Sequence, residues 1–111
     1  MSVLRFTGRV SIRERHSPQF DWDRGNIDHI ALHGVTPAEA EQVVLNDPID
    51  LQFQLRNGEE RIAQVGETAA GRILVVITTV RDDLIRVVTA FPAIRRLRKL
   101  YLAQKGRENE G

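Results

Sequence analysis

The stretch Asp50-Leu-Gln-Phe-Gln-Leu-Arg-Asn-Gly-Glu-Glu-Arg-Ile-Ala-Gln-Val-Gly66 decides the fold class. Hydrophobic residues occupy every second position from Leu51 to Leu55, as in a β-strand with one solvated face. Asn57-Gly58 is typical of a tight hairpin turn. A second strand over residues 61–66 is therefore expected to pair back on the first.

Two more strands are expected after this hairpin. Residues 72–79 contain five consecutive apolar residues, Ile73 to Ile77, which is typical of a central strand buried on both faces. Arg81-Asp-Asp83 is expected to turn the chain into a fourth strand over residues 84–91, which Pro92 ends. The strands follow one another with short connections, so the sheet is predicted to be mainly antiparallel.

Two helices are predicted before the strands. Asp23 is expected to cap a helix over residues 24–33, with Ile27, Ile30 and Ala31 as its buried stripe and Gly34 as its stop. Thr36-Pro-Ala-Glu39 combines a capping box with proline in the first turn. A second helix is therefore expected from there to Asn46.

A third helix is predicted from Ala93 onward. Its apolar stripe is expected to consist of Ile94, Leu97, Leu100 and Tyr101, and it is surrounded by four cations, Arg95, Arg96, Arg98 and Lys99. Two helices, four strands and a basic C-terminal helix predict an α+β fold.

The composition limits the function classes. A chain of 111 residues supports one hydrophobic core. It contains no cysteine, which excludes disulfides, thiolate metal sites and a cysteine nucleophile and favours a cytoplasmic location. No apolar run approaches the ~20 residues of a membrane-spanning helix, so no membrane association is expected.

The charges are segregated along the chain although the net charge is only +1. Residues 21–83 carry twelve acidic residues and five arginines, whereas residues 84–107 carry five arginines, two lysines and no acid. A basic end of this kind indicates either a surface for a polyanion or an acidic partner, or a solvated helix face.

A series of short motifs resembles a known family. The motifs are Phe20-Asp-Trp-Asp23, Asn26, His29, His33-Gly34-Val35, Glu39, Asp47-Pro48, Gly66-Glu-Thr68, Gly71-Arg72, Ile85-Arg86, Ala93, Arg95-Arg96 and Tyr101. In this order and spacing they resemble the BrnT-like toxins, a family also described as a domain of unknown function. The resemblance defines one domain over residues 20–105. Residues 1–19 are an extension with a possible strand from Leu4 to Arg13, and residues 106–111 are a polar tail.

The resemblance implies a RelE-like fold and a role as the toxin of a bacterial type II toxin–antitoxin pair. Such toxins resemble ribonucleases that cut messenger RNA and inhibit translation. The resemblance also implies a ribbon-helix-helix antitoxin, through which the pair contacts operator DNA. It implies no cofactor.

A ribonuclease without a metal must remove a proton from a ribose 2′-OH, stabilise a pentacoordinate phosphate and protonate the leaving 5′-oxygen. Arginine is well suited to stabilise the phosphate, and Arg61, Arg72 and Arg86 are expected to converge on it. Glu67 or His33 is expected to transfer protons. Arg86 is expected to share a face with Leu84, Val88 and Ala90 and therefore to need Glu67, Asp83 or a bound anion as a partner. An internal salt bridge at the sheet edge is an equally good interpretation.

The remaining aromatic and imidazole residues have two interpretations each. His29 and His33 lie four apart, the spacing of two metal ligands, but no third ligand is evident, so no metal site is predicted and buried or capping histidines are favoured. Trp22 is expected to anchor a helix in the core, with base stacking as the alternative. The predicted RNA or partner contacts are Trp22, Arg95, Arg96, Arg98, Lys99 and Tyr101.

One position departs from the family pattern. After the fourth strand, where many relatives carry an arginine, this chain has Phe91-Pro92. The loss of one phosphate donor typically lowers a rate by about 10²–10³. The alternative prediction is therefore a catalytically silent module of the same fold that binds an antitoxin-like partner or nucleic acid.

Overall fold

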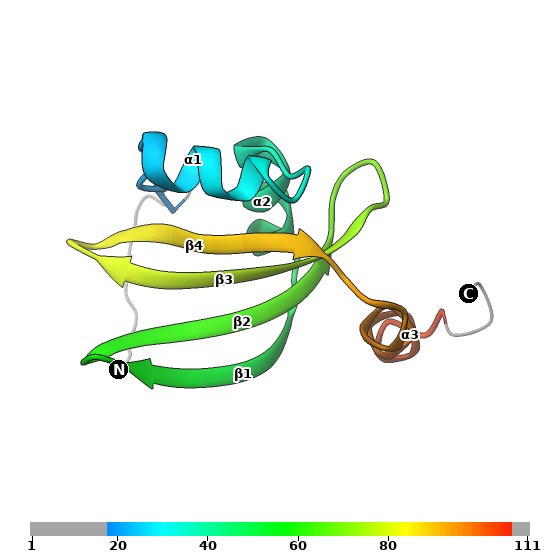
Figure 1. The fold of residues 1–111 in the computed structure, drawn as a ribbon. Coiled ribbons are helices and arrows are strands. Elements are labelled where there is room, and N and C mark those ends of the chain that lie inside the picture. The colour runs from blue at the N-terminus through cyan, green and yellow to red at the C-terminus, as the bar shows by residue number, and fades with distance from the viewer. Residues whose placement is uncertain (1–17, 108–111) are drawn as a thin grey trace, which may run out of the picture.

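The computed structural model describes residues 18–107. In chain order its elements are α1 (Arg24–Ala31), α2 (Pro37–Leu45), β1 (Ile49–Arg56), β2 (Glu59–Glu67), β3 (Ile73–Arg81), β4 (Leu84–Pro92) and α3 (Arg95–Gln104). The four strands form one antiparallel sheet in the order β1-β2-β3-β4. Figure 1 shows α1 and α2 together beside the sheet and α3 at the end where β4 leaves it. The predicted α+β class and the order of the elements are confirmed.

Both predicted hairpin turns are present. Asn57 and Gly58 have φ values of 52° and 78°, and this left-handed backbone at both central residues matches the twist of the flanking strands. The β3–β4 turn uses Asp82 and Asp83 in the same region, with φ values of 54° and 65°. Aspartate is one of the few residues other than glycine that adopts this conformation regularly.

The two predicted N-caps are confirmed. Asp23 accepts a hydrogen bond from the backbone N–H of Asn26, and the Asn26 side chain accepts one from the backbone of Asp23. Thr36 and Glu39 make the same reciprocal pair at α2. The helix α1 ends at Ala31, two residues earlier than predicted, because the chain tightens there toward Gly34, whose φ is 73°.

The sheet has a core cluster on each face, since successive residues of β3 point in opposite directions. One cluster combines strand residues with α1 and α2, and consists of Ile30, Val35, Ala40, Val43, Leu74, Val76, Val87 and Ala90. The other combines strand residues with α3, and consists of Val65, Ile73, Val75, Tyr101 and Leu102. We call the two sides of the sheet the α1–α2 face and the α3 face. The predicted burial of residues 73–77 on both sides is confirmed.

Two helix stripes differ from the prediction. In α1 the structure buries Asn26 and Ile30 and leaves Ala31 exposed. Asn26 is satisfied inside because its amide donates to the backbone carbonyls of Asp21 and Val87. The third helix, α3, is anchored mainly through its later residues. Tyr101 and Leu102 are buried, whereas Ile94 and Leu100 are exposed.

Some predictions lie outside the described residues. The possible strand from Leu4 to Arg13 and the last four residues of the polar tail are among them. Within residues 18–107 no helix is long and apolar enough to cross a membrane.

Gly66 allows α2 to pack closely on β2, which generates a first prediction. A Cβ at this position would lie 2.9 Å from Val43 Cγ1 and 3.1 Å from Pro48 Cβ. We expect Gly66→Ala to lower the free energy of unfolding by about 1–3 kcal/mol, as other overpacked cores do. Urea unfolding measures this. In the double variant with Val43→Ala, the combined loss should be smaller than the sum of the single losses, and simple additivity would contradict this account.

Candidate functional site

An irregularity in β4 determines which face carries Arg86. Thr89 pairs with Ile77, but Val87 pairs with the next residue of β3, Thr78, so Val88 has no partner. This bulge interrupts the alternation of side chains. Val87 and Ala90 consequently both point into the core of the α1–α2 face. Arg86 pairs with Thr79 and lies on the α3 face, so the prediction that it shares a face with Ala90 is wrong.

A groove at the β4 edge of the sheet, between α1 and strand side chains of the α3 face, collects three arginines and a histidine. Its volume is about 340 Å³, and its functional side chains are Arg61 from β2, Arg81 and Arg86 from the ends of β3 and β4, Glu59 from β2, and His29 from α1. The period of two in the strands explains the grouping, since Glu59 and Arg61, like Thr79 and Arg81, are two residues apart and share a side.

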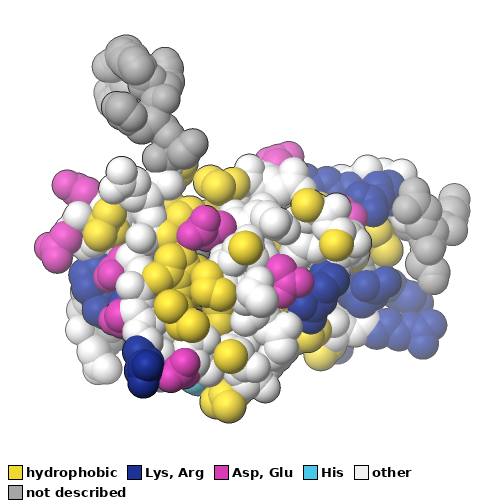
Figure 2. Space-filling model, turned by 90° about the horizontal axis from the view of Figure 1, so that it is seen from above, with side chains coloured by type: hydrophobic (Ala, Val, Ile, Leu, Met, Phe, Trp, Pro, Cys, Tyr) yellow, Lys and Arg dark blue, Asp and Glu magenta, His cyan; other side chains and the backbone are white. Residues whose placement is uncertain are grey.

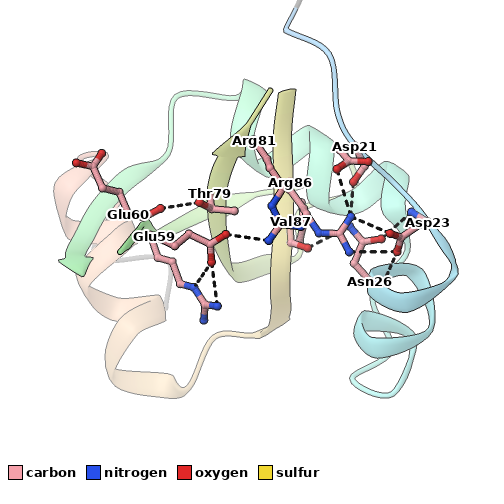
Figure 3. Close-up of polar contacts among 10 residues, drawn as sticks. Asp21, Asp23, Asn26, Glu59, Glu60, Thr79, Arg81, Arg86 and Val87 are labelled. Atoms are coloured by element: carbon pink, nitrogen blue, oxygen red, sulfur yellow. Dashed lines mark hydrogen bonds and ion pairs between the residues drawn. The ribbon is translucent and has the colours of Figure 1, made fainter. Parts of the chain in front are cut away.

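Glu59 holds two of these arginines together. Its Oε1 lies 3.1 Å from Arg61 Nη2, and its Oε2 lies 2.8 Å from Arg81 Nη2. Figure 3 shows the contact between Glu59 and Arg81. The hydrogen bonds from Arg81 and then Arg61 lower the pKa of Glu59 below its usual range. Glu59 is therefore an ionised clamp near neutral pH and a poor proton acceptor.

Arg86 is held by two aspartates that precede α1. Its Nη1 lies 3.3 Å from Asp21 Oδ2 and 3.0 Å from Asp23 Oδ2, and 17% of its side chain is exposed. Figure 3 shows both carboxylates converging on this guanidinium. The hydrogen bond from Arg86 lowers the pKa of Asp23, and Asp23 in turn raises the pKa of Arg86.

The expected partners of Arg86, Glu67 or Asp83, are thus replaced by Asp21 and Asp23. The reason is a short parallel contact at the edge of the sheet. The backbone N–H of Ile85 donates to Gln19 O over 3.0 Å, and that of Asp21 donates to Ile85 O over 2.8 Å. This pairing brings the two acids beside β4.

Both histidines are exposed, so the prediction that they are buried is wrong. His29 lies in the last turn of α1. The helix buries Asn26 and Ile30 instead, which turns the imidazoles outward. Their ring centroids are 5.7 Å apart in an edge-on arrangement, and the His33 ring lies 6.0 Å from that of Phe91. His29 lines the groove.

Two other predicted site residues lie elsewhere. Arg72 Nη1 is 2.8 Å from Glu39 Oε2 and donates to Gly34 O, so it fastens β3 to the connection between α1 and α2. Glu67 Oε1 is 2.8 Å from Arg107 Nη1, and this hydrogen bond lowers the pKa of Glu67. The structure brings Arg61 and Arg86 together and leaves Arg72 and Glu67 outside the groove.

The predicted contact residues divide into anchors and exposed cations. Trp22 packs against the core of the α1–α2 face, and its Nε1 donates to Glu41 Oε2 over 2.7 Å, as the anchoring interpretation predicts. Tyr101 is 2% exposed. The cations of α3 are exposed, namely Arg95, Arg96, Arg98 and Lys99. Figure 2 shows Lys and Arg side chains gathered at one end of the molecule.

Sequence reasoning missed Arg81, Glu59 and the aspartate pair as parts of this site. Arg81 was treated only as a turn residue, although its spacing from Thr79 places it on the same side of β3. His29 was not predicted as a proton-transfer residue. Within residues 18–107 there is no group of three or more acidic, histidine or cysteine side chains placed to hold a metal ion.

Comparison with known families identifies one match. The family model described as the ribonuclease toxin BrnT of type II toxin–antitoxin systems matches residues 22–96. This range includes all the groove residues that α1 and the sheet supply. A comparison with curated proteins finds no match.

The Glu67–Arg107 pair predicts a specific pH dependence. Because the folded pKa of Glu67 is lowered, its contribution to stability is present above the ordinary value of 4.5 and is lost as the pH falls through the folded pKa. We expect Glu67→Gln to unfold at lower urea than the wild type at pH 7, with the two curves converging in acid. The exposed Asp28→Asn serves as the control. A difference between the urea midpoints of the two proteins that persists unchanged to pH 2 would contradict an electrostatic role of Glu67.

Proposed function

The chain belongs to the BrnT family of ribonuclease toxins of type II toxin–antitoxin systems, and on this premise we propose that its groove is the active site of a metal-independent endoribonuclease. The observation that carries the proposal is that Arg61, Arg81 and Arg86 line one groove together with His29 at the β4 edge of the sheet. Cationic donors fixed around one position are what a phosphate acquiring negative charge requires.

We assign the stabilisation of the pentacoordinate phosphate to the three arginines. A guanidinium group is planar and offers paired N–H donors that match phosphate oxygens. The carboxylates of Asp21, Asp23 and Glu59 fix the directions of these groups before substrate arrives. Such preorganisation removes the cost of orienting the donors during the reaction.

The proton transfers are assigned to the imidazoles. One group must accept the 2′-OH proton, and the departing 5′-oxygen must receive a proton, which yields a 2′,3′-cyclic phosphate and a 5′-hydroxyl. Glu59 and Asp23 are unsuitable because their pKa values are lowered. His29 lines the groove, and His33 contacts its ring, so this pair supplies an acid and a base.

The biological setting follows from the family. Membership implies an antitoxin partner and an RNA substrate. We propose that the substrate is messenger RNA, that cleavage inhibits translation in the cytoplasm, and that a ribbon-helix-helix antitoxin blocks the toxin and binds operator DNA. The exposed cations of α3 are proposed to contact the RNA backbone outside the groove.

The proposal predicts the effect of removing Arg86. Arg86→Ala should lower the rate of RNA cleavage by about 10²–10³, as the loss of one fixed donor does, and Arg86→Lys should recover part of it. The exposed Arg24→Ala is the matched control with the wild-type rate. Cleavage of a short RNA should proceed in EDTA and leave a 2′,3′-cyclic phosphate. Loss of cleavage in EDTA with recovery in manganese would refute the metal-free route.

Phe91 supports a second candidate function, a silent binding module. Its side chain packs against the cluster of the α3 face and the His33 ring, so it offers an apolar surface where many relatives are expected to donate to phosphate.

The ribonuclease and the silent module predict different effects on the growth of living cells. Expression without a partner should slow bacterial growth, and Arg86→Ala should relieve this while remaining folded. Normal growth with abundant folded wild-type protein would favour the silent module.

A further inference from the structure

An apolar patch remains uncovered on the α1–α2 face, near the hairpin turns. We call it the hairpin patch and define it as Phe53, Leu55, Ile62 and Val80. Phe53 is 63% exposed, Leu55 70% and Val80 69%. A hollow of about 360 Å³ lies over it and is lined by Phe53, Ile62, Val80 and Glu60 among others. Grouped apolar residues of this size on a surface usually mark a contact site.

The register shows that the patch continues the core of this face. Ile62 pairs with Thr78, and Thr78 pairs with the buried Val87. The strands therefore extend past the part of the face that α1 and α2 cover. The patch side chains lie on the opposite face of the sheet from the groove arginines, and Glu59 lines both hollows.

The described chain begins beside this patch. Gln19 and Phe20 pair with Ile85 in β4, and Ile85 is the partner of Val80 in β3. Adjacent strands lie roughly 4.8 Å apart, so the residues before Pro18 start within two strand spacings of the patch. Seventeen residues precede Pro18, and five of them in extended form span about 16 Å.

The sequence of that segment complements the patch. Apolar residues occupy alternate positions, namely Leu4, Phe6, Val10 and Ile12, with Gly8 between them, and the intervening positions include Arg5, Arg9 and Arg13. The surroundings of the patch are acidic, since Glu60 lines the hollow and Asp82 and Asp83 form the adjacent turn. The period of two therefore lets one side of an extended segment present its apolar residues to the patch, while its arginines lie on the other side.

We propose that residues 4–13 dock on the hairpin patch as an extended segment, with their apolar side chains on Phe53, Leu55 and Val80. A second copy or an antitoxin could offer similar chemistry. The tethered segment is favoured because it is held at a high effective concentration by a short connection. The inference does not depend on catalysis.

Spin labelling tests this directly, because the chain contains no cysteine to interfere. A nitroxide attached at Val10→Cys should broaden the NMR amide signals of Phe53, Leu55 and Val80 beyond detection and leave those of α3 unchanged. A label on Gln104→Cys in α3 is the matched control and should spare the patch. Adding Phe53→Asp and Val80→Asp, two substitutions at exposed positions, should restore the patch signals in the Val10-labelled protein.

Two results would overturn the proposal. Patch signals that keep their intensity in the Val10-labelled protein would leave the patch to an external partner. Signal loss that appears when spin-labelled protein lacking ¹⁵N is mixed with unlabelled ¹⁵N protein, and disappears on dilution, would assign the patch to a second copy. The spin-label experiment measures a distance and not RNA cleavage. A failure of this inference is therefore distinguishable from a failure of the proposed function.

Discussion

The unpaired Val88 is the constraint on which the candidate site depends. With strict alternation along β4, Arg86 would point toward the same core as Ala90, where an unpaired guanidinium would be costly. The bulge lets Val87 and Ala90 share that core and turns Arg86 to the other face. One extra residue in β4 therefore lets Val87 pack under α1 and α2 while Arg86 lines the groove.

The segment before α1 links the fold to the groove. Asp21 joins the edge of β4 through its backbone and holds Arg86 through its carboxylate. Asp23 caps α1 and also contacts Arg86. Asn26 bonds the backbone on both sides of this junction. The same few residues thus begin the helix, close the sheet edge and orient the arginine, so they connect local stability with the geometry of the site.

The strands, turns and caps could be predicted because their signals are local. The alternation around Asn57-Gly58 and the capping box at Thr36 each lie within a few residues. The site was harder, because Arg86 and Asp21 are 65 positions apart and meet only through a parallel edge contact that no local pattern encodes. The bulge at Val88 likewise depends on the register with β3, so periodicity alone assigned Arg86 to the wrong face. Arg72 was misleading for the same reason, since its partner Glu39 lies in a different element.

The pairing of every groove arginine with a carboxylate has an electrostatic consequence at long range. Opposite charges a few ångströms apart largely cancel beyond a Debye length of about 8 Å in physiological salt. The α3 cations Arg95, Arg96, Arg98 and Lys99 have no acidic neighbour within their own helix. A distant polyanion would therefore be drawn first toward α3, and the groove would act only at contact. On the proposed function, encounter with RNA and its recognition would be carried by different parts of one small domain.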